Sequence, residues 1–296
     1  MAYYAQQSND SRLILRDSAE TLSITAYSGE TPTDADGAVT LGVVDAAGAE
    51  VVASGTSATS AGSGVYTYSL AGQEDLKELT TTWSGTWGAA MEFTTTSEVI
   101  GNFYCTPAEV RALDSISGEA STFPAAELVD AIEYATAIID DYCGASFVQR
   151  YQRDVLNGTN SQVIRLSQMF PETLLSASVD GTALSGSELS DTALFEDGTI
   201  QRKDGVWSYT SPGNKCIVEY EHGSGVTAPN DIRWAAKTIA RFHLLEQVSK
   251  IPSQATSINA DFGQIVLAQP GMNRPTPLPD VNVVLNRHRH RAPTAF

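Results

Sequence analysis

The chain has few cysteines and no long apolar segment, and both absences limit its class. It holds three cysteines in 296 residues, Cys105, Cys143 and Cys216, with neither a CxxC spacing nor histidines at metal-ligand intervals. A disulfide framework and a zinc site are therefore not expected, and the three thiols are predicted to be free and buried. No stretch approaches the roughly 18 apolar residues of a membrane helix, and the first residues lack the basic and apolar regions of a signal peptide. We expect a soluble protein made in a cytoplasm, without a membrane partner.

The motifs of common enzyme classes are also missing. The sequence has no glycine-rich phosphate loop, no GxSxG, no HExxH and no DxDxDG. His222 and His243 are isolated, and such histidines are more often surface or core residues than catalytic ones. Asp140 and Asp141 are adjacent on a predicted helix, so their side chains diverge by about 100° and cannot share a substrate. We expect no catalytic activity, no cofactor and no metal.

Basic residues are scarce, and their distribution is uneven. The net charge is −17, with 18 basic and 35 acidic residues. Residues 1 to 100 hold three basic and thirteen acidic groups, residues 101 to 227 seven and eighteen, and residues 228 to 296 eight and four. An acidic body repels nucleic acid, whereas a basic end favours an acidic partner surface or phosphates. Sequence-specific DNA binding is therefore not expected.

Residues 1 to 100 are predicted to form an all-β domain. With 42% hydrophobic residues, the whole chain has enough apolar material for two or three domains. Between residues 11 and 99, six short runs rich in Thr, Val and Tyr are broken by Gly, Asp and Ser turns, which is typical of a β-sandwich. Trp83, Trp87 and Met91 offer bulk for its core. Without cysteine the domain is not a disulfide-linked antibody domain, and an immunoglobulin-like sandwich is the best prediction.

Two stretches with helical periodicity follow, at 106–144 and 229–249. In the first, Thr106 is a predicted cap, Pro107 the first helical residue and Glu109 the closing member of a capping box. A short helix to about Leu113 precedes a longer one from about 124 to 142, which Gly144 is placed to end.

Residues 147 to 225, between these stretches, read as β-strands and turns. Asp180-Gly181 is a hairpin signal, because this dipeptide readily adopts the positive φ angles of a two-residue turn. The predicted fold class is therefore α+β: an N-terminal sandwich (1–100), a helical bundle interrupted by a β-rich insertion (101–250) and an extended C-terminal arm (251–296).

The helix at 229–249 places Arg233, Lys237 and Arg241 four residues apart beside an apolar stripe. One interpretation is a solvated helix face. The other is that this basic ridge meets an acidic surface, such as the side of Asp130 and Glu133, within the subunit or on a neighbour.

The arm is rich in Pro, Asn and Gln, with one predicted strand at 262–268. It ends in a brief predicted helix with apolar Val281, Val284 and Leu285. The run Arg287-His288-Arg289-His290-Arg291 follows, and Phe296 ends the sequence. Such a run is often a solvated tail, but a short apolar helix before it suggests a docking element.

The order of these motifs resembles a known family. It runs from YCTPAE (104–109) through AAELVDAIEYATAIIDDYCGASF, a β insert with SVDGTAL, then YEHGSG and APNDIRWAAKTIARF, to LPDVNVVLNRHRHR. Over about residues 104 to 291 the chain resembles the head-to-tail connector (adaptor) proteins of long-tailed bacteriophages, with an immunoglobulin-like domain added before them.

The resemblance implies a structural virion protein at the capsid-tail junction, made in the cytoplasm of a bacterial host. It implies a ring, commonly of twelve copies, that binds the portal and a neck or tail-completion protein and extends the channel for double-stranded DNA. The portal-docking residues would be Val281, Val284, Leu285, Arg287, His288, Arg289, His290, Arg291 and Phe296. The interface between copies would use Asp130, Glu133, Arg233, Lys237 and Arg241.

An alternative function is a virion-surface module whose β-sandwich recognises a carbohydrate or host surface. Trp83 and Trp87 would be its stacking platforms, although their place in alternating strands favours a core position.

Overall fold

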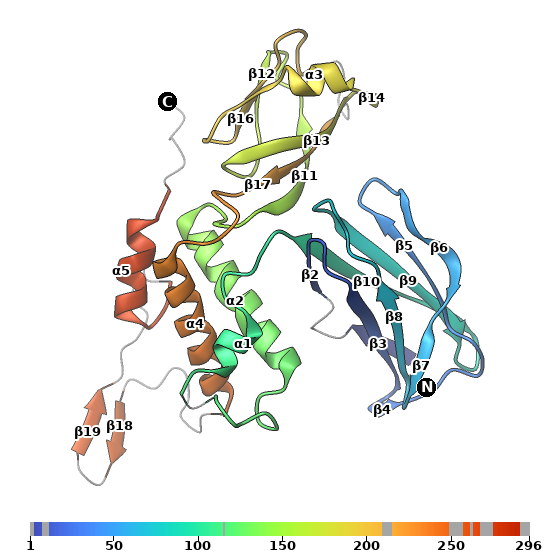
Figure 1. Cartoon of the computed structure of the whole chain (residues 1–296), viewed down its shortest axis with the longest axis vertical. Helices are drawn as coiled ribbons and strands as arrows, with labels where there is room; N and C mark the ends of the chain where they lie inside the picture. The colour runs from blue at the N-terminus through green and yellow to red at the C-terminus, as the bar shows by residue number, and fades with distance from the viewer. Residues whose placement is uncertain are drawn as a thin grey trace. The chain divides into compact units, whose positions relative to one another are not determined.

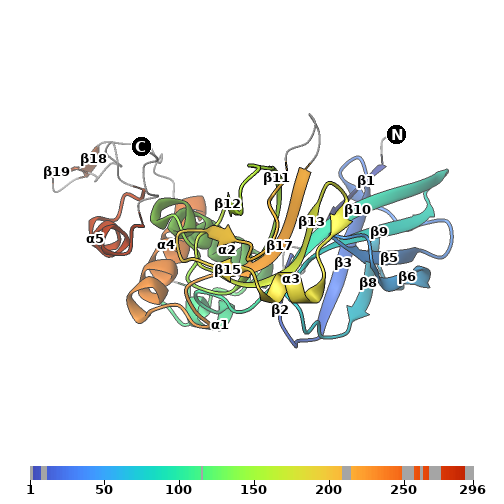
Figure 2. The same ribbon diagram turned by 90° about the horizontal axis from the view of Figure 1, so that it is seen from above.

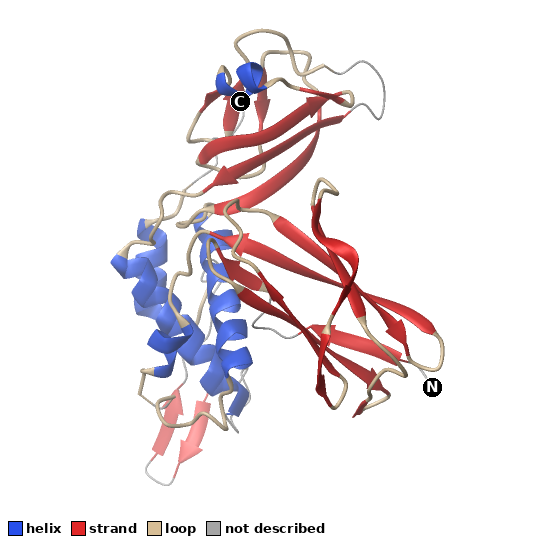
Figure 3. Cartoon of the chain, turned by 45° about the vertical axis from the view of Figure 1, so that its right-hand side comes forward, coloured by secondary structure: helices blue, strands red, loops and turns tan. Residues whose placement is uncertain are grey.

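The structure is a computed structural model with nineteen strands and five helices among the residues that it describes. Those residues are 3–7, 12–114, 116–208, 215–248, 257–260, 263–266 and 275–290. Strands make up 39% of the chain and helices 23% (Figure 3). The predicted fold class, centred on a helical bundle, is therefore wrong. The periodic helices dominate the sequence pattern, but many short strands outweigh them in the folded chain.

The N-terminal region contains two five-stranded sheets around one core. The first sheet consists of β1 (Tyr3–Gln7), β3 (Glu20–Ser28), β8 (Val65–Leu70) and β7 (Thr59–Gly62) in that order, with β4 (Thr31–Pro32) beside β3. The second consists of β2 (Leu13–Leu15), β10 (Ala90–Ile100), β9 (Glu78–Thr86), β5 (Thr40–Asp45) and β6 (Glu50–Ser57). Neighbouring strands are antiparallel except β2 and β10, which are parallel.

The core between these sheets comes from the period-two alternation of the strands. In β3, Leu22, Ile24 and Ala26 are buried, and the residues between them are partly exposed. Trp83 and Trp87 are 0% and 1% exposed, so they lie in the core and offer no stacking surface. The alternative function therefore loses its tryptophan platforms.

The insertion also contains two sheets. One consists of β11 (Arg150–Asn157), β17 (Lys215–His222), β13 (Pro171–Val179) and β14 (Thr182–Ala183), and the other of β12 (Val163–Arg165), β16 (Thr199–Gln201) and β15 (Ala193–Leu194), with the short helix α3 (Gly186–Ser190) between β14 and β15. Asp180 and Gly181 have φ of 53° and 78° and join β13 to β14, as the Asp-Gly pattern predicts.

A buried carboxylate ties the two insertion sheets together. Asp154 of β11 accepts hydrogen bonds from the Tyr220 hydroxyl at 2.9 Å and from the Ser167 amide at 2.7 Å. The Ser167 hydroxyl and the Gln152 amide also donate to it. Asp154 is only 5% exposed, but these hydrogen bonds satisfy its carboxylate.

Packing divides the chain into two compact units. The first comprises Met1–Asn102, Gln149–Ser167 and Pro171–His222, and the second Phe103–Val148, Gln168–Phe170 and Gly223–Phe296. Within the first unit, Arg150 donates to Glu98 at 2.6 Å and Arg16 pairs with Glu221, so ion pairs connect the N-terminal strands to the insertion. The three-domain division drawn from the sequence stays a prediction.

The second unit, called the helical unit below, is built from four helices (Figures 1 and 2). They are α1 (Pro107–Arg111), α2 (Ala125–Cys143), α4 (Asn230–Val248) and α5 (Pro279–Arg287). The predicted end signals are confirmed: Thr106 and Glu109 form a capping box, and Gly144 ends α2 with φ of 73°. The arm holds a hairpin of β18 (Ser257–Ala260) and β19 (Gly263–Val266) where the sequence predicted one strand.

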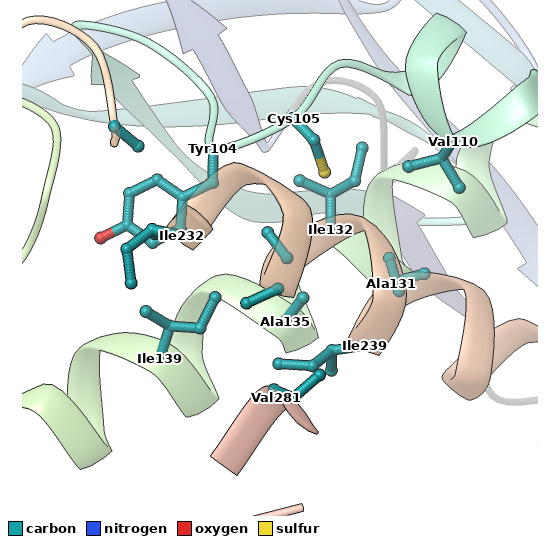
Figure 4. Close-up of a cluster of buried hydrophobic side chains, with 14 of the residues drawn as sticks. Tyr104, Cys105, Val110, Ala131, Ile132, Ala135, Ile139, Ile232, Ile239 and Val281 are labelled. Atoms are coloured by element: carbon teal, nitrogen blue, oxygen red, sulfur yellow. The ribbon is translucent and has the colours of Figure 1, made fainter. Parts of the chain in front are cut away.

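The helical unit has a tightly buried core between α2, α4 and α5 (Figure 4). Ile132, Ile139, Ile232, Ile239 and Val281 point toward one another there, each 2% exposed or less. Among the described helices, none is long and apolar enough to cross a membrane. All three cysteines are free and buried, as predicted, and burial raises the pKa of Cys105 and of Cys143 to about 12.

A buried tyrosine fixes the chain on both sides of α2. The Tyr104 hydroxyl donates to the Asp140 carboxylate and accepts from the Phe147 amide at 2.8 Å. Burial, the charge of Asp140 and the bond to it raise the pKa of Tyr104 well above its ordinary value, so the hydroxyl stays protonated.

We expect Tyr104→Phe to destabilise the helical unit by about 1–3 kcal/mol, because it removes the hydroxyl that bonds to the buried Phe147 amide and to the Asp140 carboxylate. Urea unfolding followed by circular dichroism measures this. Tyr134→Phe is the matched control, since Tyr134 on α2 is 44% exposed. Equal unfolding midpoints for the two variants would contradict the assigned role.

Candidate interaction surface of the helical unit

The basic ridge predicted on α4 contacts α1 of the same chain. Arg233 donates to Glu109 at 2.7 Å, and the Lys237 ammonium lies 3.9 Å from the same carboxylate. Arg241 donates to the Asp114 carbonyl at 3.0 Å. The Thr106 amide, then the two cations, keep the pKa of Glu109 below its ordinary value despite partial burial. Glu109 thus caps α1 and pairs with α4.

The acidic residues of α2 were the predicted partners of this ridge. Asp130 and Glu133 are half-buried, and α2 holds five acidic residues and no basic one. Arg233 and Lys237 face Glu109 of α1. The basic ridge therefore meets an acidic side chain of its own subunit, that of Glu109.

The apolar side of α5 is part of the core. Val281 and Leu285 are 0% exposed, and Val284 packs against the same cluster. Buried Asn282 is held by Thr276: its amide donates to the Thr276 carbonyl at 2.8 Å and its carbonyl accepts from the Thr276 hydroxyl at 2.9 Å. Of the predicted docking residues, Val281 and Leu285 thus stabilise their own subunit and cannot enter a partner's groove without leaving this core.

The start of the basic run is anchored at the N-terminus of α4. His288 Nε2 lies 2.7 Å from an Asp231 oxygen, and Arg287 Nη1 lies 3.7 Å from it. The ring of Phe147 meets the His288 ring edge-on at 5.5 Å. Burial would raise the pKa of Asp231, but the hydrogen bond and charge of His288 and the Ile232 amide lower it below its ordinary value.

The next residues of the run cover the C-terminus of α2. The His290 amide donates to the Cys143 carbonyl at 2.8 Å, and the Arg289 guanidinium lies 4.9 Å from the centre of the Tyr142 ring. The last turn of α2 has no basic residue of its own, so Arg289 supplies the cation that a helix C-terminus favours. Arg291 and Phe296 lie outside the described residues.

Only one side of α5 faces solvent. Val283 is 60% exposed and the Arg287 side chain 66%, and the two are four residues apart, so they share a face. Val283 was not among the predicted docking residues, because the apolar periodicity of this helix was assigned to a partner surface. When the apolar stripe is assigned to the chain's own core, Val281 and Leu285 point inward and Val283 is the apolar residue that stays exposed.

The remaining candidates for a metal or catalytic site are the histidines His222 and His243. The described residues contain no group of three or more His, Cys, Asp or Glu arranged for a metal ion. His222 is buried, and burial together with Arg150 lowers its pKa to about 4, so it is neutral near pH 7. His243 stacks on Tyr134 with ring centres 4.1 Å apart. These contacts give each histidine a place in the packing of its unit.

Comparison with known proteins gives one family and two structures. A family model described as head completion protein matches residues 108–290, more than half of the chain. A chain in the neck of an empty gene transfer agent particle, computed with C6 symmetry, is 16% identical with a TM-score of 0.42. A chain in the virion of a native gene transfer agent particle is 15% identical with the same TM-score. Each match covers 62% of this chain and 88% of the other.

No curated protein matches the chain. Residues 1–107 lie outside the family match, so the predicted immunoglobulin-like domain gains no support from it.

The anchor of α5 predicts a pH dependence of stability. Because the folded pKa of Asp231 is lowered, its contribution is present above the unfolded pKa near 3.9 and is lost as the pH falls through the folded value. We expect Asp231→Asn to remove about 0.5–1 kcal/mol at pH 7 and less at pH 2, a range discounted for solvent screening of a one-third exposed group.

Urea unfolding at the two pH values measures that difference. Asp280→Asn, an exposed acid in the first turn of α5, is the control. An equal loss for Asp231→Asn at both pH values would show that the carboxylate charge does not hold α5.

Proposed function

Because this chain belongs to the head completion protein family, we propose that it forms a ring, of twelve copies, that joins the portal at the capsid vertex to the neck and tail. The family is a structural one, so the chain is a connector-type protein of a phage-like virion. The resemblance to connector proteins is confirmed to that extent. The ring, its partners and the DNA channel are the proposal.

The observation that carries the ring is the separation of charge on the helical unit. Every charged residue of α2 is acidic, whereas the α4 ridge holds three cations, two of which face the single carboxylate of Glu109. A closed ring needs two different, complementary patches on each copy. We assign Asp130 and Glu133 to one patch and Arg233, Lys237 and Arg241 to the other.

The acidic character of the chain also suits a DNA channel. With a net charge of −17, like charges weaken non-specific binding of phosphates, so DNA passes without sticking. The bases of the DNA need not be read for this role.

The portal contact is assigned to the exposed side of α5. Val283 offers apolar area, and Arg287 offers a guanidinium that binds carboxylates through two parallel hydrogen bonds. We assign Arg289 and His290, and the predicted docking residues Arg291 and Phe296, to the same portal contact. Val281, Val284 and Leu285 hold the helix in place beneath it.

We expect Asp130→Lys to reduce the fraction of chain in rings on the order of tenfold, because it replaces an attraction between copies by a repulsion. Negative-stain microscopy and sedimentation with purified portal rings at low salt measure the fraction. Lys237→Asp in the same chain restores the pair across the interface and is expected to rescue assembly. Glu92→Lys on β10 is the control, since it changes the net charge equally outside the helical unit.

Wild-type chain that forms no ring in the presence of portal rings would refute the proposal. If Asp130→Lys forms rings as well as the wild type does, the ring proposal stands but the assigned interface between copies is wrong.

For the portal contact, we expect Arg287→Glu to weaken co-sedimentation with portal rings about tenfold or more, because a positive group is replaced by a negative one against an acidic surface. Deleting residues 280–296 is a poorer test, since it also empties the core of Val281 and Leu285. Lys203→Glu is the matched control, with its side chain 64% exposed in the other unit. Unchanged binding of Arg287→Glu would exclude this side of α5.

A further inference from the structure

Two ion pairs join the N-terminal sheets to the insertion. Glu98 lies near the end of β10, and the Arg150 guanidinium at the start of β11 donates to both of its carboxylate oxygens, through Nε at 2.6 Å and through Nη2. Arg16, which follows β2, pairs with Glu221 of β17. These four residues are called the clasp below. Their side chains are 26% exposed or less, so water and salt screen the two attractions only in part.

The main chains of the two parts approach closely beside the clasp. The Gly101 amide donates to the Gln149 carbonyl at 3.0 Å, and a Cβ at Gly101 would lie 2.8 Å from the Gln149 Cβ. Tyr151 of β11 packs against the hydrophobic core of the N-terminal sheets. The two parts therefore meet through ion pairs, a main-chain hydrogen bond and an aromatic side chain, and their separation exposes all of these groups to water.

A buried histidine lies beside the clasp. His222 is the last residue of β17, it lies directly opposite Arg150 in the sheet, and it is 5% exposed. On its other side β13 contributes the uncharged Pro171. No described residue forms a hydrogen bond with Nδ1 of His222. The buried ring therefore has a cation as its cross-strand neighbour and one nitrogen that is not satisfied.

The charges around His222 oppose its protonation in the closed contact. Arg150 and Asp154 of β11 act on the ring, and the Tyr220 ring of its own strand lies 5.9 Å away. Burial and the positive charge of Arg150 lower the pKa of His222 to about 4, against the opposite effect of Asp154. A proton on His222 places a second positive charge beside Arg150 in a buried site, and this charge is stabilised only when water reaches the ring.

We propose that His222 and the clasp form an acid-sensitive lock: the N-terminal sheets stay fixed to the insertion while His222 is neutral, and they separate from it when His222 takes up a proton. Opening hydrates the ring and returns its pKa toward the ordinary value of about 6.5. The open state therefore binds an additional proton between about pH 6.5 and pH 4. Its population rises as the pH falls through this window and is lowest above it. The lock acts within one chain and is independent of the proposed ring and portal contact.

Hydrogen exchange of the full chain, followed by mass spectrometry on the peptide that contains Gly101, measures the open population once the intrinsic pH dependence of exchange is corrected. We expect this population to rise on the order of tenfold or more from pH 7.5 to pH 5. His222→Gln is expected to remove the rise, because an amide side chain does not titrate. His243→Gln, in the helical unit, is the matched control and is expected to keep it.

The ion pair of the lock is tested by the same measurement at pH 7.5. We expect Glu98→Gln to raise the open population several-fold, because it removes the carboxylate that Arg150 binds. The double variant Glu98→Arg, Arg150→Glu re-forms the pair in the reverse direction and is expected to restore the closed contact. It also places a carboxylate beside His222, so that its open population is expected not to rise between pH 7.5 and pH 5. Glu92→Gln, an exposed acid of β10, is the control.

Exchange around Gly101 that is equal at the two pH values in the wild type would overturn the proposal. The same holds if His222→Gln keeps the full rise in acid, or if Glu98→Gln exchanges as slowly as the wild type at pH 7.5. Circular dichroism checks that each variant is folded. If His222→Gln does not fold, the double variant supplies the same pH test, and a tenfold rise in it contradicts the lock.

Discussion

The packing of α2 against α4 is the contact on which the helical unit depends. These helices are separated by the whole insertion, yet their small buried residues, among them Ala131, Ala135, Ala236 and Ala240, let them approach closely. α5 packs against both helices, and their ends hold the basic run. The position of every other helical element follows from it.

Two carboxylates of the helical unit each bind more than one basic residue. Glu109 caps α1 and also pairs with two cations of α4, and Asp231 holds both Arg287 and His288. Each acid joins segments that are far apart in sequence.

The C-terminal helix shows why an apolar stripe does not by itself mark a docking surface. A short amphipathic helix has the same pattern whether its apolar side covers its own subunit or a partner. Here Val281 and Leu285 complete the core, and Val283 and Arg287 lie on the exposed side.

Local signals in the sequence determined the helix ends at Thr106 and Gly144, the Asp180-Gly181 turn and the burial of the three thiols, because each depends on neighbouring residues or on composition. The balance of strand over helix was missed, because short strands give weaker patterns than two long periodic helices. Only the tertiary structure paired Arg233 with Glu109, turned Val281 inward and set His222 opposite Arg150. These contacts join residues distant in the chain, and their choice depends on how whole elements pack and on strand register, which no local pattern encodes.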